Sequence, residues 1–533
     1  MELSLLESSD PPYRAANHDK IAPVELSTVM QPVEAPTNHQ SHPVSTLPTG
    51  RATIVIAMLS SINFVNSLSN GMITVALPAI ATDIALDSNL LVWPTSVTSL
   101  TSGTCVLVAG AVADVVGPRS INLAGCLLMG CFVLACGLSQ TGIQLVLFRA
   151  MQGIASALTV PTGISIVSTS VADGRPRNLG FGCLGLSQPL GFSVGLVLGG
   201  VFVDSIGWRA GFYVGGALSF ILFVMGIWAL PSVQDPSRSS SQPSTLRRLA
   251  RDVDWVGAGM ASASIALFSY VLAMLSANID SIRSAGNIVT LIISMALVPA
   301  FVFWVGRQER KGQPALIPNS IWKNAAFTSI CLMVLLSYAV QNSIELFSSL
   351  FFQKVQGTTA LGASLRLLPN LLCGAALDLC TGLLVNKVSA TTAVLVSSGL
   401  ATLSPLLMAL INPHWPYWYD AFPAQLLAPI SGDVLFTIGL IIVSASFPAH
   451  TQGLAGAVFN TVAQIGTSVG LTVLSVIATS VTKNAGSADG DAARAIMKGY
   501  RASFWALFAM MILVCVIGGV GLRKLGKVGH KRD

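Results

Sequence analysis

The feature that most constrains this chain is a series of about fourteen apolar stretches, each long enough to cross a bilayer as a helix. Charged residues make up 10% of the 533 residues, against roughly 25% in a soluble domain. Within lipid every backbone N–H and C=O needs a partner inside the protein, and a helix provides one within each stretch. The sequence therefore predicts an all-α polytopic membrane protein.

The arrangement of apolar and polar segments predicts a domain plan. The polar connection PSRSSSQPSTLRRLARD separates the first six stretches from the remaining eight, and GAVADVVGPRS and GLLVNKVS end similar helices in the two parts. Two six-span halves around a midplane site are a frequent transporter plan. We expect a disordered cytosolic tail (1–50), a six-helix bundle (51–230), a cytosolic linker (231–254), two inserted spans with a loop (255–323), a second six-helix bundle (324–522) and a basic cytosolic tail (523–533).

A glycine stripe lies in the run GLSQPLGFSVGLVLGG. Gly191, Gly195 and Gly199 are four residues apart, with Gly200 beside the last. Residues four apart share one helical face, so a neighbouring helix can approach to backbone distance there. The stripe indicates either static helix packing or a sliding contact in a transporter.

Arg149 is a charge inside an apolar stretch, in the run LVLFRAMQGIASAL. Such a charge is costly unless it faces water or a polar partner. Gln152 shares its helical face, and Gly153 leaves room beside it. Arg149 either snorkels to the headgroups or faces a wet interior. Because Gln152 lies on the same face, we favour the interior.

Asp433 lies close to the middle of the stretch 423–447, deeper than any other carboxylate. A buried carboxyl can exchange a proton when water reaches it from one side and then the other. We expect Asp433 to couple transport to protons; a permanently protonated, structural Asp is the alternative. Asp378 and Glu345 are weaker candidates, and Arg366 either neutralises Glu345 or snorkels.

The short turn after the second stretch holds a further set of candidates. Gly110 allows close packing of the helix end, and Gly117 with the following proline enforces the reversal. Asp114 can oppose a helix N-terminus or a basic partner in the other half. Asp114 and Arg119 then form a cytosolic gate, and a solvated turn is the alternative.

These segments resemble the major facilitator superfamily. GAVADVVGPR is similar to its loop motif and FRAMQGIASA to its span-4 motif, while the glycine stripe is similar to its span-5 antiporter motif without the usual proline. ITVALP matches the end of span 1 in the fourteen-span drug:proton antiporter branch, where Ser69 replaces a frequent Asp. DSIGWRAGFYV, SGDVLFT and HTQGLAGAVFNTVAQIGTSVGL resemble fungal aminotriazole-resistance-type transporters in particular.

The resemblance implies the major facilitator fold, with two six-helix bundles plus two extra helices, and efflux driven by proton entry. It implies a proton-transfer role for the span-4 motif around Arg149, and a monomer. The expected cargo is a small toxic or secondary-metabolite compound, exported by alternating access, and members of this group export unrelated toxic compounds, borate included. Plasma membrane is the expected location and vacuolar membrane the alternative, and both termini are expected in the cytosol because Lys and Arg gather on that side.

The sequence leaves three alternative functions, of which a purely structural or receptor role is the hardest to exclude. A nutrient importer or facilitator of the same fold is disfavoured by the resistance-type resemblance and the lack of a dense polar ring. A membrane-embedded enzyme needs an acid/base or metal constellation, yet the six His residues lie in tails or loops and no Cys/His cluster occurs. We expect no enzyme activity, cofactor or metal. Scattered basic residues also give no sign of nucleic-acid binding.

Overall fold

The computed structural model describes residues 47–86, 90–91, 93–172, 175–231, 249, 251, 253–277, 283–313, 315–384, 389–446, 449–489 and 492–522. Within these residues all regular structure is helical, which confirms the predicted all-α class. The expected C-terminal tail (523–533), most of the N-terminal tail (1–50) and most of the linker (231–254) lie outside them.

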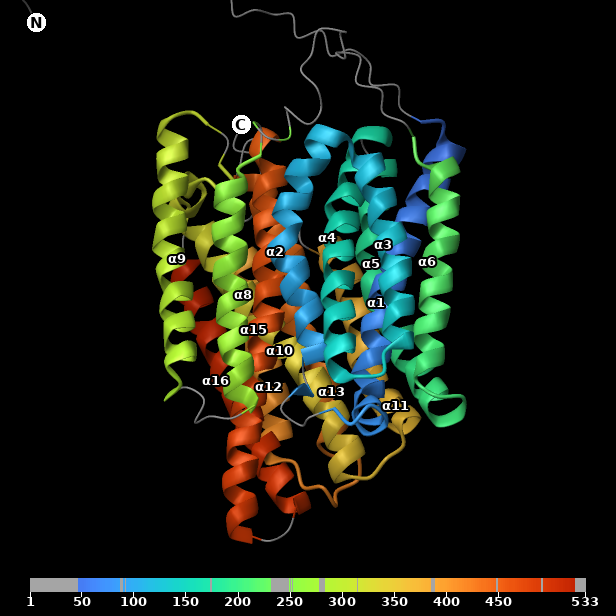
Figure 1. Ribbon diagram of the computed structural model, residues 1–533, viewed down its shortest axis with the longest axis vertical. Helices are drawn as coiled ribbons and strands as arrows, with labels where there is room; N and C mark the ends of the chain where they lie inside the picture. The colour runs from blue at the N-terminus through green and yellow to red at the C-terminus, as the bar shows by residue number, and fades with distance from the viewer. Residues whose placement is uncertain are drawn as a thin grey trace, which may run out of the picture. The chain divides into compact units, whose positions relative to one another are not determined.

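The helices follow one another in antiparallel succession (Figure 1). In chain order they are α1 (Thr49–Asp83), α2 (Trp93–Val116), α3 (Pro118–Leu138), α4 (Gly142–Ser170), α5 (Arg175–Ser205), α6 (Arg209–Ala229), α8 (Trp255–Ala277), α9 (Ala285–Arg310), η3 (Asn319–Lys323), α10 (Ala325–Leu350), η4 (Phe351–Val355), α11 (Ala360–Leu384), α12 (Ala390–Leu410), α13 (Ala421–Leu427), α14 (Ile430–Ser446), α15 (Ala449–Asp489) and α16 (Ala492–Gly521).

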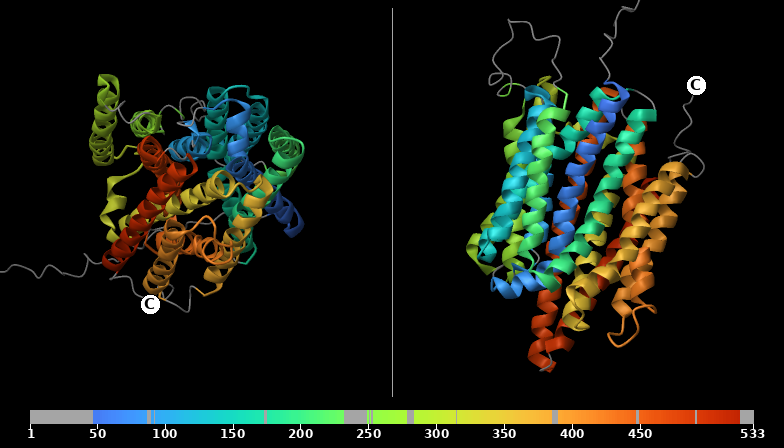
Figure 2. Two further views of the ribbon diagram at one scale, coloured as in Figure 1. Left: turned by 90° about the horizontal axis from the view of Figure 1, so that it is seen from below. Right: turned by 90° about the vertical axis from the view of Figure 1, so that its right-hand side faces the viewer.

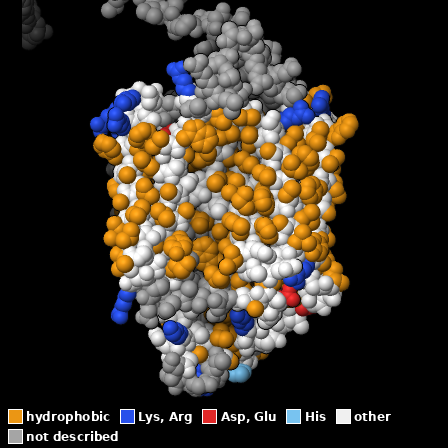
Figure 3. Space-filling view, viewed as in Figure 1, with side chains coloured by type: hydrophobic (Ala, Val, Ile, Leu, Met, Phe, Trp, Pro, Cys, Tyr) orange, Lys and Arg blue, Asp and Glu red, His pale blue; other side chains and the backbone are white. Residues whose placement is uncertain are grey.

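Thirteen of the described helical segments are long and apolar enough to cross a membrane, and α8 adds a shorter apolar segment at Trp255–Phe268. Figure 3 shows hydrophobic side chains over the middle of one face, with Lys and Arg toward its two ends. This distribution suits a bilayer, because apolar side chains meet the acyl chains and basic ones meet the headgroups. The predicted polytopic membrane protein is confirmed.

The helices form two groups, here named the N-half (α1–α6) and the C-half (α10–α16). In the N-half α1 packs on α5 and α6, and α4 packs on α2 and α3. In the C-half α10 and α16 both pack on α15, and α14 contacts α10, α11 and α12. The halves meet where α5 packs on α11 and where α2 packs on α15. Figure 2 shows the same arrangement from two further sides.

Helices α8 and α9 pack on each other, and α8 also contacts α2 and α15. Ser264 and Ser294 each donate a hydroxyl to the other's backbone carbonyl, at 2.9 and 2.8 Å. Asp254 accepts from the backbone of Gly257 and from Trp304 Nε1, so one buried carboxylate joins the start of α8 to α9. Most α9 side chains are exposed, which places this helix at the edge of the bundle.

The described hydrogen bonds that join the N-half directly to the C-half lie at one end of the bundle. This is the lower end in Figure 1, opposite the start of α1 and the end of α16. The donors all belong to α10, η4 or α11, and the acceptors to α1 or α5. The bonds run from Ser349 to the Thr74 carbonyl (3.4 Å), from Gln353 to the Val75 carbonyl (3.1 Å), from Ser364 to the Leu196 carbonyl (2.7 Å) and from the Leu361 N–H to Asp204 (3.1 Å).

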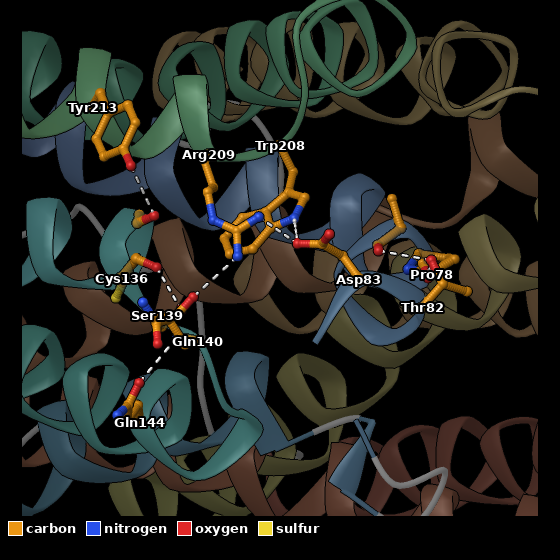
Figure 4. A network of polar contacts seen from close by, with 12 residues as sticks. Pro78, Thr82, Asp83, Cys136, Ser139, Gln140, Gln144, Trp208, Arg209 and Tyr213 are labelled. Atoms are coloured by element: carbon orange, nitrogen blue, oxygen red, sulfur yellow. Dashed lines mark hydrogen bonds and ion pairs between the residues drawn. The ribbon is translucent and has the colours of Figure 1, made fainter. Parts of the chain in front are cut away.

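A polar network fastens the N-half at the same end (Figure 4). Asp83, at the end of α1, forms an ion pair with Arg209 and accepts from Trp208 Nε1 at 3.1 Å. Arg209 also donates to the Ser139 carbonyl beyond α3 and stacks over the Trp208 ring. Because the ion pair is partly exposed, its main effect is to orient the ends of α1, α3 and α6.

The glycine stripe forms a close helix contact in the N-half. All four glycines are buried, and three face α1 while Gly200 faces α11. A Cβ at each position would overlap existing atoms. The overlapped groups are the Phe64 carbonyl for Gly191, the Leu68 carbonyl for Gly195, Met72 Cα for Gly199 and the Leu361 backbone for Gly200. Helix α5 therefore approaches α1 at backbone distance and continues onto the C-half.

Gly195→Ala is expected to destabilise the protein by about 1–3 kcal/mol, because the added methyl group overlaps the backbone of α1. Gly185→Ala on the same helix is the matched control, since no described atom lies within 4 Å of a Cβ there. Thermal unfolding of the purified proteins measures both. A Gly195→Ala protein as stable as the Gly185→Ala protein would contradict the tight α1–α5 packing.

Candidate functional site

Arg149 is completely buried in the N-half and is held by three neutral oxygens. Its Nε donates to the Pro94 carbonyl (2.8 Å), Nη1 to Gln152 Oε1 (2.8 Å) and Nη2 to Asn70 Oδ1 (2.7 Å). These contacts tie α4 to α1 and α2. With 0% of its surface exposed, the side chain does not snorkel to the headgroups.

Gln152 extends this network to α1, where its Nε2 donates to Ser69 Oγ at 3.1 Å. In the fourteen-span antiporter branch that this chain resembles, an Asp often occupies the position of Ser69. Among the described residues no carboxylate lies within 4 Å of the Arg149 guanidinium. The described partners of this buried cation are thus neutral dipoles, an arrangement that is costly in an apolar interior.

Gly153 was expected to leave room beside Arg149, and that room is occupied by α2. A Cβ at Gly153 would overlap the Thr101 hydroxyl and the Thr98 carbonyl. Thr101 in turn donates to the Ala150 carbonyl at 2.8 Å. The glycine brings α2 close enough for the Pro94 carbonyl to reach Arg149.

Arg149→Lys is expected to lower the free energy of unfolding by about 1–3 kcal/mol, because one ammonium cannot reproduce three divergent contacts and leaves a buried acceptor unpaired. Arg307→Lys makes the same substitution at the exposed end of α9 and is expected to leave the free energy of unfolding unchanged. Denaturation midpoints of the two variants in detergent test this. Equal midpoints would show that the three hydrogen bonds of the Arg149 guanidinium contribute nothing to stability.

The C-half contains a second polar group, here named the carboxyl–amide cluster: Gln341, Glu345, Asn370 and Asp433. Asn370 Nδ2 on α11 donates to Glu345 Oε1 at 3.3 Å. Gln341 Nε2 on α10 donates to Asp433 Oδ1 on α14 at 3.2 Å. Gln341 and Glu345 are four residues apart, so the two pairs lie one helical turn apart along α10.

The two carboxylates differ in enclosure. Glu345 is 6% exposed and Asp433 is half-buried, so Glu345 is the more enclosed of the two. Asp433 lies near the middle of the stretch from the start of α13 to the end of α14, as expected, but a break before it places it in the first turn of α14. The break arises because α13 ends at Leu427 and Pro429, which has no N–H to donate, precedes α14.

Two glycines make space for the cluster. A Cβ at Gly374 on α11 would meet Asp433 Oδ2 at 2.5 Å, and one at Gly432 on α14 would overlap Gln341 Oε1. Gln341 Oε1 and Asn370 Oδ1 are both buried without a hydrogen-bond partner. The cluster is therefore enclosed by three helices, and two of its acceptor atoms are unused.

Arg366 does not neutralise Glu345. Its Nη1 donates to Gln356 Oε1 at 3.0 Å, and its guanidinium lies 5.4 Å from the Phe352 ring centroid and 5.9 Å from that of Tyr417. Tyr417 donates its hydroxyl to the Arg366 carbonyl at 2.7 Å. Burial raises the pKa of Tyr417 to about 12, so the hydroxyl keeps its proton at neutral pH.

The expected gating residues lie at the α2–α3 turn. Gly117 has φ +111° and lets the chain reverse directly into Pro118, the first residue of α3. The close packing expected at Gly110 is not seen among the described residues, since none of their atoms outside the local backbone of α2 lies within 4 Å of a Cβ there. Arg119 donates to the Ile227 carbonyl of α6 at 2.7 Å, a contact inside the N-half.

Two further candidate residues lie in helices, but their side chains are not described. Asp114 belongs to α2 and Asp378 to α11, and the side chains of both are outside the described part of the structure. Their expected roles in gating and proton coupling stay predictions.

Sequence reasoning missed Asn70, Gln341 and Asn370. A signal was present for the first, because Asn63, Asn66 and Asn70 recur at helical spacing along an otherwise apolar stretch. Gln341 precedes Glu345 by four residues, which is the same kind of signal. Nothing in the spacing linked Asn370 to Glu345, since the pair bridges two helices.

Comparison with known proteins identifies relatives over most of the chain. The model of the family described as the Major Facilitator Superfamily matches residues 59–471. The "MFS-type transporter 1" of Pyricularia oryzae is 39% identical and covers 98% of this chain and 94% of its own length. In Saccharomyces cerevisiae, the "Low affinity ammonium transporter" is 26% identical (82% and 79% covered) and the "Aminotriazole resistance protein" 24% identical (81% and 77%).

A solved structure shares the fold. The bacterial homologue of the human lysosomal transporter Spinster, crystallised in an inward-facing and unoccupied conformation, superposes with a TM-score of 0.64. The match covers 91% of this chain and 99% of that one at 16% sequence identity. The fold predicted from the sequence, two six-helix bundles plus two extra helices, is confirmed.

Proposed function

Because this chain belongs to the Major Facilitator Superfamily, we propose that it is a proton-coupled exporter of small toxic compounds or secondary metabolites. The relatives support this direction, since they include a protein named for aminotriazole resistance. It acts without enzymatic chemistry or a cofactor, as a monomer in the plasma membrane or alternatively the vacuolar membrane, with both termini in the cytosol.

The observation that carries the proposal is the burial of Glu345, whose described hydrogen-bond partner is the amide of Asn370. Among the described residues no Lys or Arg lies within 4 Å of its carboxyl group. An ionised carboxylate is costly in an apolar interior, so the group is expected to bind a proton when enclosed and release it when water enters. Asp433, one turn away along α10, supplies a second proton-binding group, and Asp378 stays a third candidate.

Arg149 is proposed to assist coupling from the N-half. The buried cation is held by Asn70 on α1 and by the Pro94 carbonyl on α2, so a shift of either helix changes its surroundings. A shift of α1 or α2 within the N-half is thereby linked to the electrostatics of the interior. This is a positioning role, whereas the resemblance to the span-4 motif implies proton transfer.

Alternating access is supported by the uneven contacts between the halves. The described hydrogen bonds between the halves gather at the end opposite the start of α1 and the end of α16, where Ser364 and Gln353 reach carbonyls of the N-half. If the tails are cytosolic, this end is the closed outer gate. Opening requires these bonds to break while α5 moves against α1 and α11 along its glycine stripe. Asp114 and Arg119 are proposed to hold the cytosolic gate closed when the outer gate is open.

A facilitator of nutrients or borate is the second candidate. It is favoured by the similarity to the low-affinity ammonium transporter of Saccharomyces cerevisiae. An exporter of this kind moves cargo against its gradient at the expense of the proton gradient, whereas a facilitator only equilibrates it.

Proteoliposomes with an imposed pH gradient separate the two functions. With radiolabelled aminotriazole, and with borate and ammonium as further probes, the exporter is expected to concentrate at least one probe on the proton-rich side. Glu345→Gln and Asp433→Asn are expected to reduce this transport to the rate of protein-free vesicles, because neither amide can take up a proton.

Glu309→Gln, an exposed carboxylate at the end of α9, is the matched control and should transport normally. Equal fluxes of every probe whichever way the pH gradient points would reject proton coupling. Gradient-independent equilibration of borate or ammonium would establish the facilitator instead.

A further inference from the structure

The carboxyl–amide cluster has hydrogen-bond acceptors in excess. Asn370 donates to Glu345 and Gln341 donates to Asp433. When both carboxylates are ionised, as in the state open to water, their oxygens only accept, and these bonds then fix the orientation of each amide group. The amide oxygens, Asn370 Oδ1 and Gln341 Oε1, are left buried and unpartnered.

An unpartnered acceptor inside a protein is costly, and nearly all such groups find a donor. Asn370 is 1% exposed, so bulk water does not satisfy its oxygen. Gln341 Oε1 occupies the space left by the missing side chain of Gly432. The polar groups are thus built into the packing of α10, α11 and α14, and a ligand that brings donors would satisfy them.

The charge of the cluster restricts the ligand further. Glu345 has no Lys or Arg within 4 Å among the described residues. Arg366, one turn from Asn370 on α11, is engaged by Gln356. An anion would be repelled by the carboxylates, and an ester or ketone would add acceptors where donors are missing.

We infer that the cluster binds a cation that carries N–H groups, such as a protonated amine, an amidinium or a guanidinium. Glu345 compensates the charge, and the carbonyl oxygens of Asn370 and Gln341 accept the N–H hydrogens. This inference rests on the proposed export function and names its cargo class.

Equilibrium binding to the purified full-length protein in detergent tests the inference. Three probes share one carbon skeleton: phenethylammonium has charge and N–H groups, its N,N,N-trimethyl analogue has charge alone, and 2-phenylethanol is neutral. Affinity is expected to fall in that order, by about tenfold at each step.

Variants assign the ranking to the cluster. Glu345→Gln is expected to weaken phenethylammonium binding by about tenfold and leave 2-phenylethanol unaffected. Asn370→Leu and Gln341→Leu are each expected to bring the primary and trimethylated cations closer in affinity, because they remove an acceptor without removing charge. Glu309→Gln should bind like the wild type.

Equal affinities for the three probes, or a ranking unchanged in both Glu345→Gln and Asn370→Leu, would overturn the inference. Should a variant fail to fold, the ranking in the wild-type protein decides alone. Binding without a gradient is independent of coupling. Selective amine binding without pH-driven transport therefore refutes only the exporter, and pH-driven transport without amine selectivity refutes only the cargo class.

Discussion

The structure depends on the exclusion of water from the bundle interior. In lipid a polar group has no solvent to return to, so each must find its partner on a neighbouring helix. Arg149 illustrates this, since one guanidinium takes oxygens from α1, α2 and its own helix. The same requirement makes the two unpartnered amide oxygens of the carboxyl–amide cluster informative, because they mark a place where the resting packing is incomplete.

Close backbone packing is the second determinant. Without a hydrophobic force between helices inside lipid, association depends on van der Waals contact, which small residues strengthen. The glycine stripe lets α5 lie directly on α1 and reach α11 through Gly200. A single helix therefore belongs to the packing of both halves. The proton-binding candidates Glu345 and Asp433 lie in the C-half, and Arg149 lies across the interface in the N-half.

The sequence was most informative about the N-half. There Arg149, Gln152 and the glycine stripe were identified from spacing within single helices, and the structure shows each in contact with an adjacent helix. It was less informative about the C-half, where Glu345 was placed nearer the outer mouth and the structure encloses it more fully than Asp433. The break at Pro429, between α13 and α14, was not predicted either. Arg366 was expected either to neutralise Glu345 or to snorkel, and its guanidinium contacts Gln356 instead of Glu345. The position of a residue along a helix says little about which neighbour its side chain faces.

What the sequence determined by itself is the class of protein: apolar stretches of bilayer length leave few alternatives to membrane-spanning helices, and ordered motifs indicated the superfamily. The tertiary structure decided which polar residues meet. Asn370 reaches Glu345 and Gln341 reaches Asp433 across different helices. Helical periodicity fixes the face on which a residue lies, but the rotation and neighbour of each helix arise only when all of them pack together.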